Sequence, residues 1–83
     1  MTNGREFDQP GSYRIRLQGS FDEKWLAYWF DGFVVAEQNA SETTLTGSVL
    51  DEPALYGLLA RIRDLGLKLL LLERLTEHTK KQV

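Results

Sequence analysis

Tyr13, Ile15 and Leu17 alternate strictly with polar residues near the start of the chain. This period of two, with β-branched and aromatic side chains at the apolar positions, predicts a half-buried strand over residues 13–18. Gly19 is expected to end it. The same residue types predict further strands over residues 33–38, 43–50 and 67–74, with a hairpin loop over 39–42 between the second and third strands.

A short helix is expected between the first and second strands, ending near Phe30. The residues of its apolar stripe follow helical spacing: Trp25, Leu26, Trp29 and Phe30. Ser20, followed three residues later by Glu23, predicts a capping box in which each side chain accepts the other's backbone N–H. Because the segment is short, an irregular aromatic turn is the alternative, and it would leave a meander packed by a single helix.

The clearest amphipathic helix follows the third strand. Asp51 suits its N-cap, Pro53 fits its first turn, and Gly66 is expected to end it in the left-handed conformation. Gly57 costs the helix about 1 kcal/mol relative to Ala, so we expect it to permit the close approach of a helix or strand, with a ligand contact as the alternative. The apolar stripe consists of Leu55, Leu58, Leu59, Ile62 and Leu65.

The resulting order, β-α-β-β-α-β, predicts an α+β fold of the ferredoxin-like type. In this sandwich, two helices cover one face of a four-stranded antiparallel sheet. We expect a single domain over residues 13–75, preceded by a flexible leader over residues 1–12 and followed by a flexible polar tail over residues 76–83.

Four consecutive leucines in the last strand do not fit a sheet that is covered on one face only, because such a strand should alternate. Some of them must meet a loop, the leader through Phe7, or a second subunit. Arg14 and Arg16 are expected on the open face of the sheet, and Tyr28 lies off the apolar stripe of the first helix. The predicted interface therefore consists of Leu69, Leu70, Leu71, Leu72, Arg14, Arg16 and Tyr28, and the expected partner is a second copy in a homodimer, or another protein.

Five aromatic residues are concentrated around the first helix: Trp25, Tyr28, Trp29, Phe30 and Phe33. A stacking platform or partner-binding patch is one interpretation. We expect most of them in the core instead, since so short a helix must bury its face with large side chains. Tyr28 is the member expected to be exposed.

The composition excludes several classes of protein. The 83 residues contain no cysteine, which excludes a disulfide scaffold, a thiolate zinc site, a thiol nucleophile and an iron–sulfur cluster. The net charge of −2, and Arg, Thr and Ser where RNA-recognition domains place aromatics, argue against nucleic acid. No apolar run approaches the roughly 20 residues of a membrane helix. Without an export signal, the expected location is cytoplasmic.

No pattern in the sequence indicates catalysis. His78 is the only histidine and stands alone in the expected tail, so it predicts neither a metal site nor a general base. The acidic residues that begin each helix are explained by helix capping and the helix dipole. No phosphate-binding loop or nucleophile motif is present. We therefore expect no enzyme activity, no catalytic or metal-binding residues and no cofactor.

Two resemblances accompany these patterns. The stretch from Asp51-Glu52-Pro53-Ala54-Leu55 to Leu65-Gly66-Leu67 resembles the strand–helix–strand half of ACT-type regulatory domains, with Ala54 where that family has Gly. The resemblance implies a small-molecule site formed by residues 47–51, the start of the second helix and a neighbouring subunit.

The span from Tyr13 to Leu75 resembles a family of small uncharacterised bacterial proteins. The matching pattern includes Trp29-Phe30-x-Gly32, Leu45-x-Gly47 and Ala54-Leu55-x-Gly57-Leu58-Leu59. This resemblance supports the fold and implies no activity. The sequence thus predicts an interaction or oligomerisation module, with an ACT-like ligand sensor as the alternative.

Overall fold

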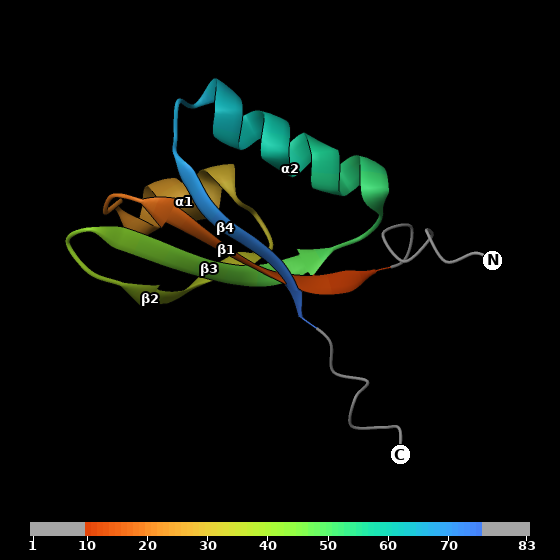
Figure 1. The fold of residues 1–83 in the computed structure, drawn as a ribbon, viewed down its shortest axis with the longest axis horizontal. Coiled ribbons are helices and arrows are strands. Elements are labelled where there is room, and N and C mark those ends of the chain that lie inside the picture. The colour runs from red at the N-terminus through yellow and green to blue at the C-terminus, as the bar shows by residue number, and fades with distance from the viewer. Residues whose placement is uncertain (1–9, 76–83) are drawn as a thin grey trace, which may run out of the picture.

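The computed structural model describes residues 10–75, and Figure 1 shows both helices on the same side of one sheet. The six elements follow the predicted order, β-α-β-β-α-β. The antiparallel strands lie in the order β2-β3-β1-β4, which confirms the ferredoxin-like prediction. The elements are β1 (Gly11–Gln18), α1 (Glu23–Trp29), β2 (Phe33–Gln38), β3 (Glu42–Val49), α2 (Glu52–Asp64) and β4 (Leu69–Leu75).

β2 has the predicted bounds, and the boundaries of the other strands differ from prediction by at most two residues. β1 begins at Gly11 because Gly11 and Ser12 pair with Val49 and Ser48 of β3. Residues 1–9 of the expected leader, including Phe7, and the expected tail with His78 lie outside the described residues. Within residues 10–75, no helix is both long and apolar enough to cross a membrane.

The core lies between the helices and the face of the sheet that they cover, which we call the covered face. Tyr13, Ile15 and Leu17 of β1 point to this face, as the strict alternation predicted. The apolar stripe of α2 has five residues. Three of them are buried, and the other two are partly buried and pack against the core. The buried core consists of Tyr13, Ile15, Leu17, Leu26, Phe30, Leu45, Val49, Leu55, Leu58 and Ile62.

The N-terminus of α1 is formed differently from the predicted capping box. Asp22 is the N-cap, and its Oδ2 accepts hydrogen bonds from the backbone N–H groups of Lys24 at 3.0 Å and Trp25 at 3.2 Å. Ser20 does not cap the helix because the chain beside it is tied elsewhere: the Phe21 N–H donates to Gln38 Oε1 of β2 at 2.8 Å. The capping-box prediction is wrong, whereas the short helix is confirmed over the aromatic turn.

The aromatic cluster is mostly part of the core, as expected. Phe30 is fully buried, Trp25, Trp29 and Phe33 pack against the core, and Tyr28 is 76% exposed. Stacked and edge contacts join Trp25 to Phe21, with ring centroids 5.5 Å apart, and Trp29 to Tyr28 at 5.0 Å. The large side chains let a seven-residue helix cover its share of the sheet.

Both ends of α2 are formed by the residues that the sequence predicted for them. Asp51 Oδ1 accepts from the Ala54 N–H at 2.9 Å, and Pro53 lies in the first turn. Gly66 has a φ of +75°. Its N–H donates to Arg63 O, and the next N–H, of Leu67, donates to Ile62 O. This pair of bonds is a Schellman motif, and it turns the chain back toward β4.

A β-bulge in β4 explains the run of leucines. Leu72 is paired with Ile15 and Leu69 with Leu17, so both lie on the covered face although they are three positions apart in the sequence, an odd spacing that regular alternation would place on opposite faces. The register shift leaves Leu70 without a partner residue in β1, and Leu71 is paired with Arg16 on the opposite face. Because of this extra residue, a run of four leucines is compatible with a sheet that is covered by helices on one face only.

Close approach occurs at a different glycine from the one predicted. A Cβ atom on Gly47 would lie 2.5 Å from Gly32 O and 2.6 Å from the Phe33 ring, so β3 requires glycine there. A Cβ atom on Gly57 would meet nothing within 4 Å. The prediction that Gly57 permits tight packing is wrong, and this glycine faces open space.

Candidate functional site

The second face of the sheet, which we call the open face, is not covered by a helix in the described part of the chain (Figure 1). The strand registers place a row of side chains from each strand on it. These residues are Ser12, Arg14, Arg16 and Gln18 of β1; Val34 and Glu37 of β2; Glu42, Thr44, Thr46 and Ser48 of β3; and Leu71, Glu73 and Leu75 of β4. The face is therefore polar at its centre, with apolar residues toward its edges.

Two arginines on the central strand β1 each face a glutamate on a different neighbouring strand. Arg14 Nη1 lies 3.0 Å from Glu73 Oε1, and Arg16 Nε lies 3.7 Å from Glu42 Oε1. The four side chains are 40% to 45% exposed, so each ion pair contributes at most about 1 kcal/mol. Glu37, in contrast, makes no ion pair with any described residue. The pattern is a basic centre with acidic residues on either side.

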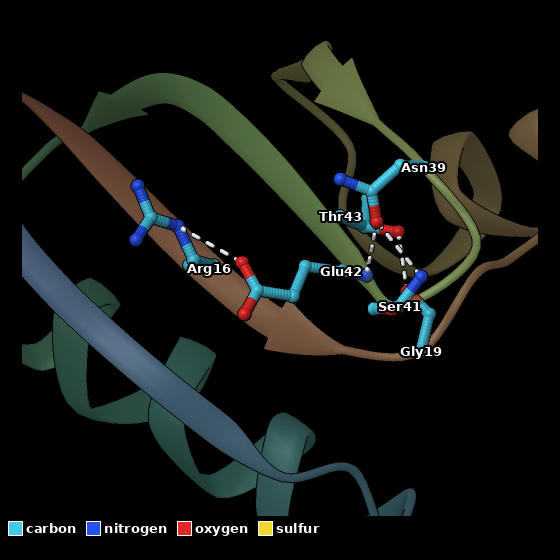
Figure 2. Close-up of polar contacts among 6 residues, drawn as sticks. All are labelled: Arg16, Gly19, Asn39, Ser41, Glu42 and Thr43. Atoms are coloured by element: carbon cyan, nitrogen blue, oxygen red, sulfur yellow. Dashed lines mark hydrogen bonds and ion pairs between the residues drawn. The ribbon is translucent and has the colours of Figure 1, made fainter.

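A polar hollow of about 240 Å³ opens on this face beside the β2–β3 hairpin. It is lined by Arg16, Glu37, Asn39, Glu42 and Thr44. The side-chain oxygen Oδ1 of Asn39 accepts from the backbone N–H groups of Ser41 at 2.8 Å and Glu42 at 2.9 Å (Figure 2). This turn fixes the backbone of the hairpin, so Glu42 projects toward Arg16 from a well-defined position.

Thr44 at the base of the hollow is only 7% exposed, yet its side chain forms no hydrogen bond within the described chain. Its neighbour Thr43 points to the covered face and has two acceptors within reach. The Thr43 hydroxyl lies 2.8 Å from Gly19 O and 2.6 Å from Gln38 Oε1, and its single hydrogen serves one of them at a time. A buried hydroxyl without a partner is uncommon and marks Thr44 as a group that a ligand could satisfy.

The strand order places β4 at one edge of the sheet, where its leucines are partly accessible. Leu69 is 36% and Leu70 is 42% exposed, while Leu71 and Leu72 are half-buried. Within residues 10–75, β4 pairs with β1 alone. An edge strand of this kind offers unpaired backbone groups beside apolar side chains, and a bulge is one feature that limits pairing with other chains.

The structure brings together part of the predicted interface. Arg14, Arg16 and Leu71 share the open face, whereas Leu69 and Leu72 lie on the covered face and Leu70 lies at the bulge of β4. Tyr28 does not belong to this surface. It lies on α1, which packs on the covered side, and it contacts Trp29 edge to face.

A groove lies between the C-terminal end of α1 and the helix α2, beside Gly57, where the sequence offered a ligand contact as the alternative interpretation. Its volume is about 420 Å³, within the usual range for small-molecule sites. Arg61 of α2 borders it and donates from Nη1 to the carbonyl oxygen of Trp29 at 2.9 Å. Gly57 lies in its wall. The available signal was this glycine, which interrupts an otherwise good helix without being needed for packing.

Metal-binding residues do not form a cluster in the described part of the chain: no three His, Cys, Asp or Glu side chains lie close enough together to hold an ion.

Comparison with known proteins identifies the family. No curated protein and no solved structure matches the sequence. The family model described as a domain of unknown function, DUF8691, matches residues 12–73, which is 62 of the 83 residues and spans β1 to β4 almost completely. The expected resemblance to a small family without an assigned activity is confirmed to this extent, and the chain belongs to the DUF8691 family.

Proposed function

We propose that this domain is a non-enzymatic interaction module that assembles into a homodimer through the open face of its sheet, with the leucine-rich edge strand β4 adding apolar contact area. The observation that carries the proposal is the open face itself, which joins paired charges at its centre to the partly exposed leucines of β4. The absence of enzymatic activity and the cytoplasmic location remain the expectations drawn from the sequence.

The leucines, more than the charges, favour a partner. An antiparallel sheet can face water on one side without cost when that side is polar, as β1 and β3 are here. Leu71 and Leu75 interrupt this polarity, and Leu70 adjoins them at the bulge. Burying these apolar side chains against a partner would stabilise the complex by about 25 cal/mol for each square ångström of apolar surface removed from water.

The dimensions of the face fit a dimer of modest affinity. Four strands spaced about 4.8 Å apart, with residues rising about 3.3 Å each, give a face of about 20 by 25 Å. This extent corresponds to the lower end of the area that specific interfaces bury on each partner. We therefore expect the dimer to form in the micromolar range.

Sedimentation velocity or light scattering across the micromolar range tests the proposal. We expect a concentration-dependent transition from monomer to dimer. Leu71→Thr should weaken the dimer about tenfold, because it removes apolar area from the interface and retains a β-branched strand former. Leu50→Thr is the matched control, since Leu50 is 67% exposed and lies in the loop after β3. A wild-type protein that stays monomeric throughout the range would overturn the proposal.

A second candidate function is sensing of a small molecule, as the ACT-type resemblance implied. The groove beside α2 favours it, because the lining includes Ser48, Leu50 and Ala54, which lie at the position expected from that resemblance. Thermal-shift measurements against amino acids and nucleotides test this candidate. A ligand that stabilises the wild type should fail to stabilise Gly57→Leu, whose side chain would enter the groove, and the absence of a shift across the panel would count against sensing.

A further inference from the structure

The hollow beside the β2–β3 hairpin has more hydrogen-bond acceptors than the described chain uses. Among residues 10–75, Glu37 has no ion-pair partner and the Thr44 hydroxyl has no hydrogen-bond partner, although Thr44 is only 7% exposed. Glu42 lies 3.7 Å from Arg16 Nε, beyond hydrogen-bond distance. The two carboxylates and one guanidinium that line the hollow give a formal charge of −1 (+1 − 2), so the hollow favours a cationic group with several donors.

We propose that the hollow binds the guanidinium of Arg14 from a second copy of the chain, and that the same contact is made reciprocally in the homodimer. This inference rests on the proposed self-association and specifies its central contact. A guanidinium has five N–H donors in a planar fork, which suits a site that offers two carboxylates and a hydroxyl.

Arg14 is available for this contact. Its side chain is 40% exposed on the open face, and its ion-pair partner among residues 10–75 is Glu73, which Nη1 contacts at 3.0 Å. The remaining donors of the fork can engage a second carboxylate while this ion pair is kept. Arg16 is less suited to the role, because it forms part of the wall of the hollow, and Figure 2 shows it turned toward Glu42.

The strand register permits the reciprocal geometry. Arg14 is paired with Thr46, and Arg16 is paired with Thr44, so Arg14 and Thr44 are diagonal neighbours across β1 and β3. A two-fold axis that runs between two stacked sheets and passes midway between these positions places each Arg14 over the hollow of the other copy. Both contacts then form together, as an isologous interface requires.

The two halves of the contact are also complementary in charge. The basic residue projects from the central strand, whereas the carboxylates of Glu37 and Glu42 lie toward the hairpin end of β2 and β3. A copy rotated about this axis therefore brings opposite charges together at both contacts. Charge complementarity of this kind fixes the register of an interface and disfavours other arrangements.

A charge-reversal experiment on the full chain tests the inference. Arg14→Glu and Glu37→Arg should each weaken the homodimer by about tenfold or more, because each places like charges together twice. An equimolar mixture of the two variants should recover dimers, since every contact in the mixed dimer again joins opposite charges. Arg63→Gln is the control: it removes an exposed arginine from α2, on the covered side of the sheet and away from the hollow, and should leave dimerisation intact.

The outcomes separate this inference from the proposed function. A wild-type protein that remains monomeric overturns both. A wild-type dimer that Arg14→Glu leaves unchanged overturns the inference alone and leaves self-association to the leucines of β4. Variants that dissociate singly and do not associate when mixed also overturn it, provided that circular dichroism shows each variant to be folded.

Discussion

Thr43 and Thr44 are neighbours in β3, are both more than nine-tenths buried, and lie on opposite faces of the sheet. Thr43 faces the helices, and its hydroxyl lies within 3 Å of two acceptors, Gly19 O and Gln38 Oε1. Thr44 is on the open face and has no side-chain hydrogen bond within the described chain. The comparison indicates that the buried hydroxyl on the covered face finds its hydrogen-bond acceptors within the chain. The hydroxyl on the open face keeps a donor and an acceptor that no described residue uses.

The largest expected difference between the faces concerns apolar burial. Ile15 is fully buried on the covered face, so Ile15→Ala should lower the free energy of unfolding by about 2 to 5 kcal/mol, the range for such core truncations. Arg16→Ala, the next residue and on the open face, should change it by less than about 1 kcal/mol. Urea unfolding at a concentration where the protein is monomeric measures both, and equal losses would contradict the assignment of faces.

The next effect separates the two threonines directly. Thr43→Val should destabilise the domain by about 1 to 3 kcal/mol, because Gly19 O and Gln38 Oε1 lose the hydroxyl that lies between them. Thr44→Val removes a hydroxyl that has no partner in the described chain, so the monomer should be unchanged or slightly more stable. Thermal unfolding of both variants checks this. A Thr44 variant as unstable as the Thr43 variant would show that the hydroxyl is satisfied within the monomer.

Two glycines give a smaller pair of opposite effects. Gly57→Ala should stabilise the domain by about 1 kcal/mol, since alanine is the better helix former and its Cβ meets nothing within 4 Å. Gly47→Ala should destabilise it, because its Cβ would lie 2.5 Å from Gly32 O in a backbone contact that cannot yield easily. Denaturant midpoints for the two variants should therefore move in opposite directions, and a shift of both in one direction would contradict the packing described.

These contrasts show which features could be predicted from the sequence. The order of elements and the α2 boundaries were predictable because periodicity, Asp51 and Gly66 are local signals whose meaning does not depend on distant contacts. The N-terminus of α1 was not, because Ser20 fails as a cap for a non-local reason: Phe21 is bound by Gln38, seventeen residues away. The bulge at Leu70 likewise depends on the register between β1 and β4.

The candidate site was predictable only in part. Alternation placed Arg14 and Arg16 on the open face, as their register confirms. It could not associate Glu37 and Thr44 with Arg16, because the hollow requires the pairing of three strands. The grouping of Tyr28 with this surface came from its exposure alone, which says nothing about the side of the sheet on which a residue lies.

The smallest expected effect concerns the ion pair of Arg14, and its dependence on protein concentration is informative. In the monomer, Arg14→Gln removes an exposed contact with Glu73, so the free energy of unfolding should fall by less than about 1 kcal/mol and the loss should diminish in high salt. If the dimer forms through Arg14, its unfolding is coupled to dissociation, and the loss should grow as the protein concentration is raised. Arg63→Gln, which removes an exposed ion pair with Asp64 on α2, should show a small loss that is the same at every concentration. Thermal unfolding of both variants over a wide concentration range makes the comparison, and parallel behaviour of the two arginines would place Arg14 outside the interface.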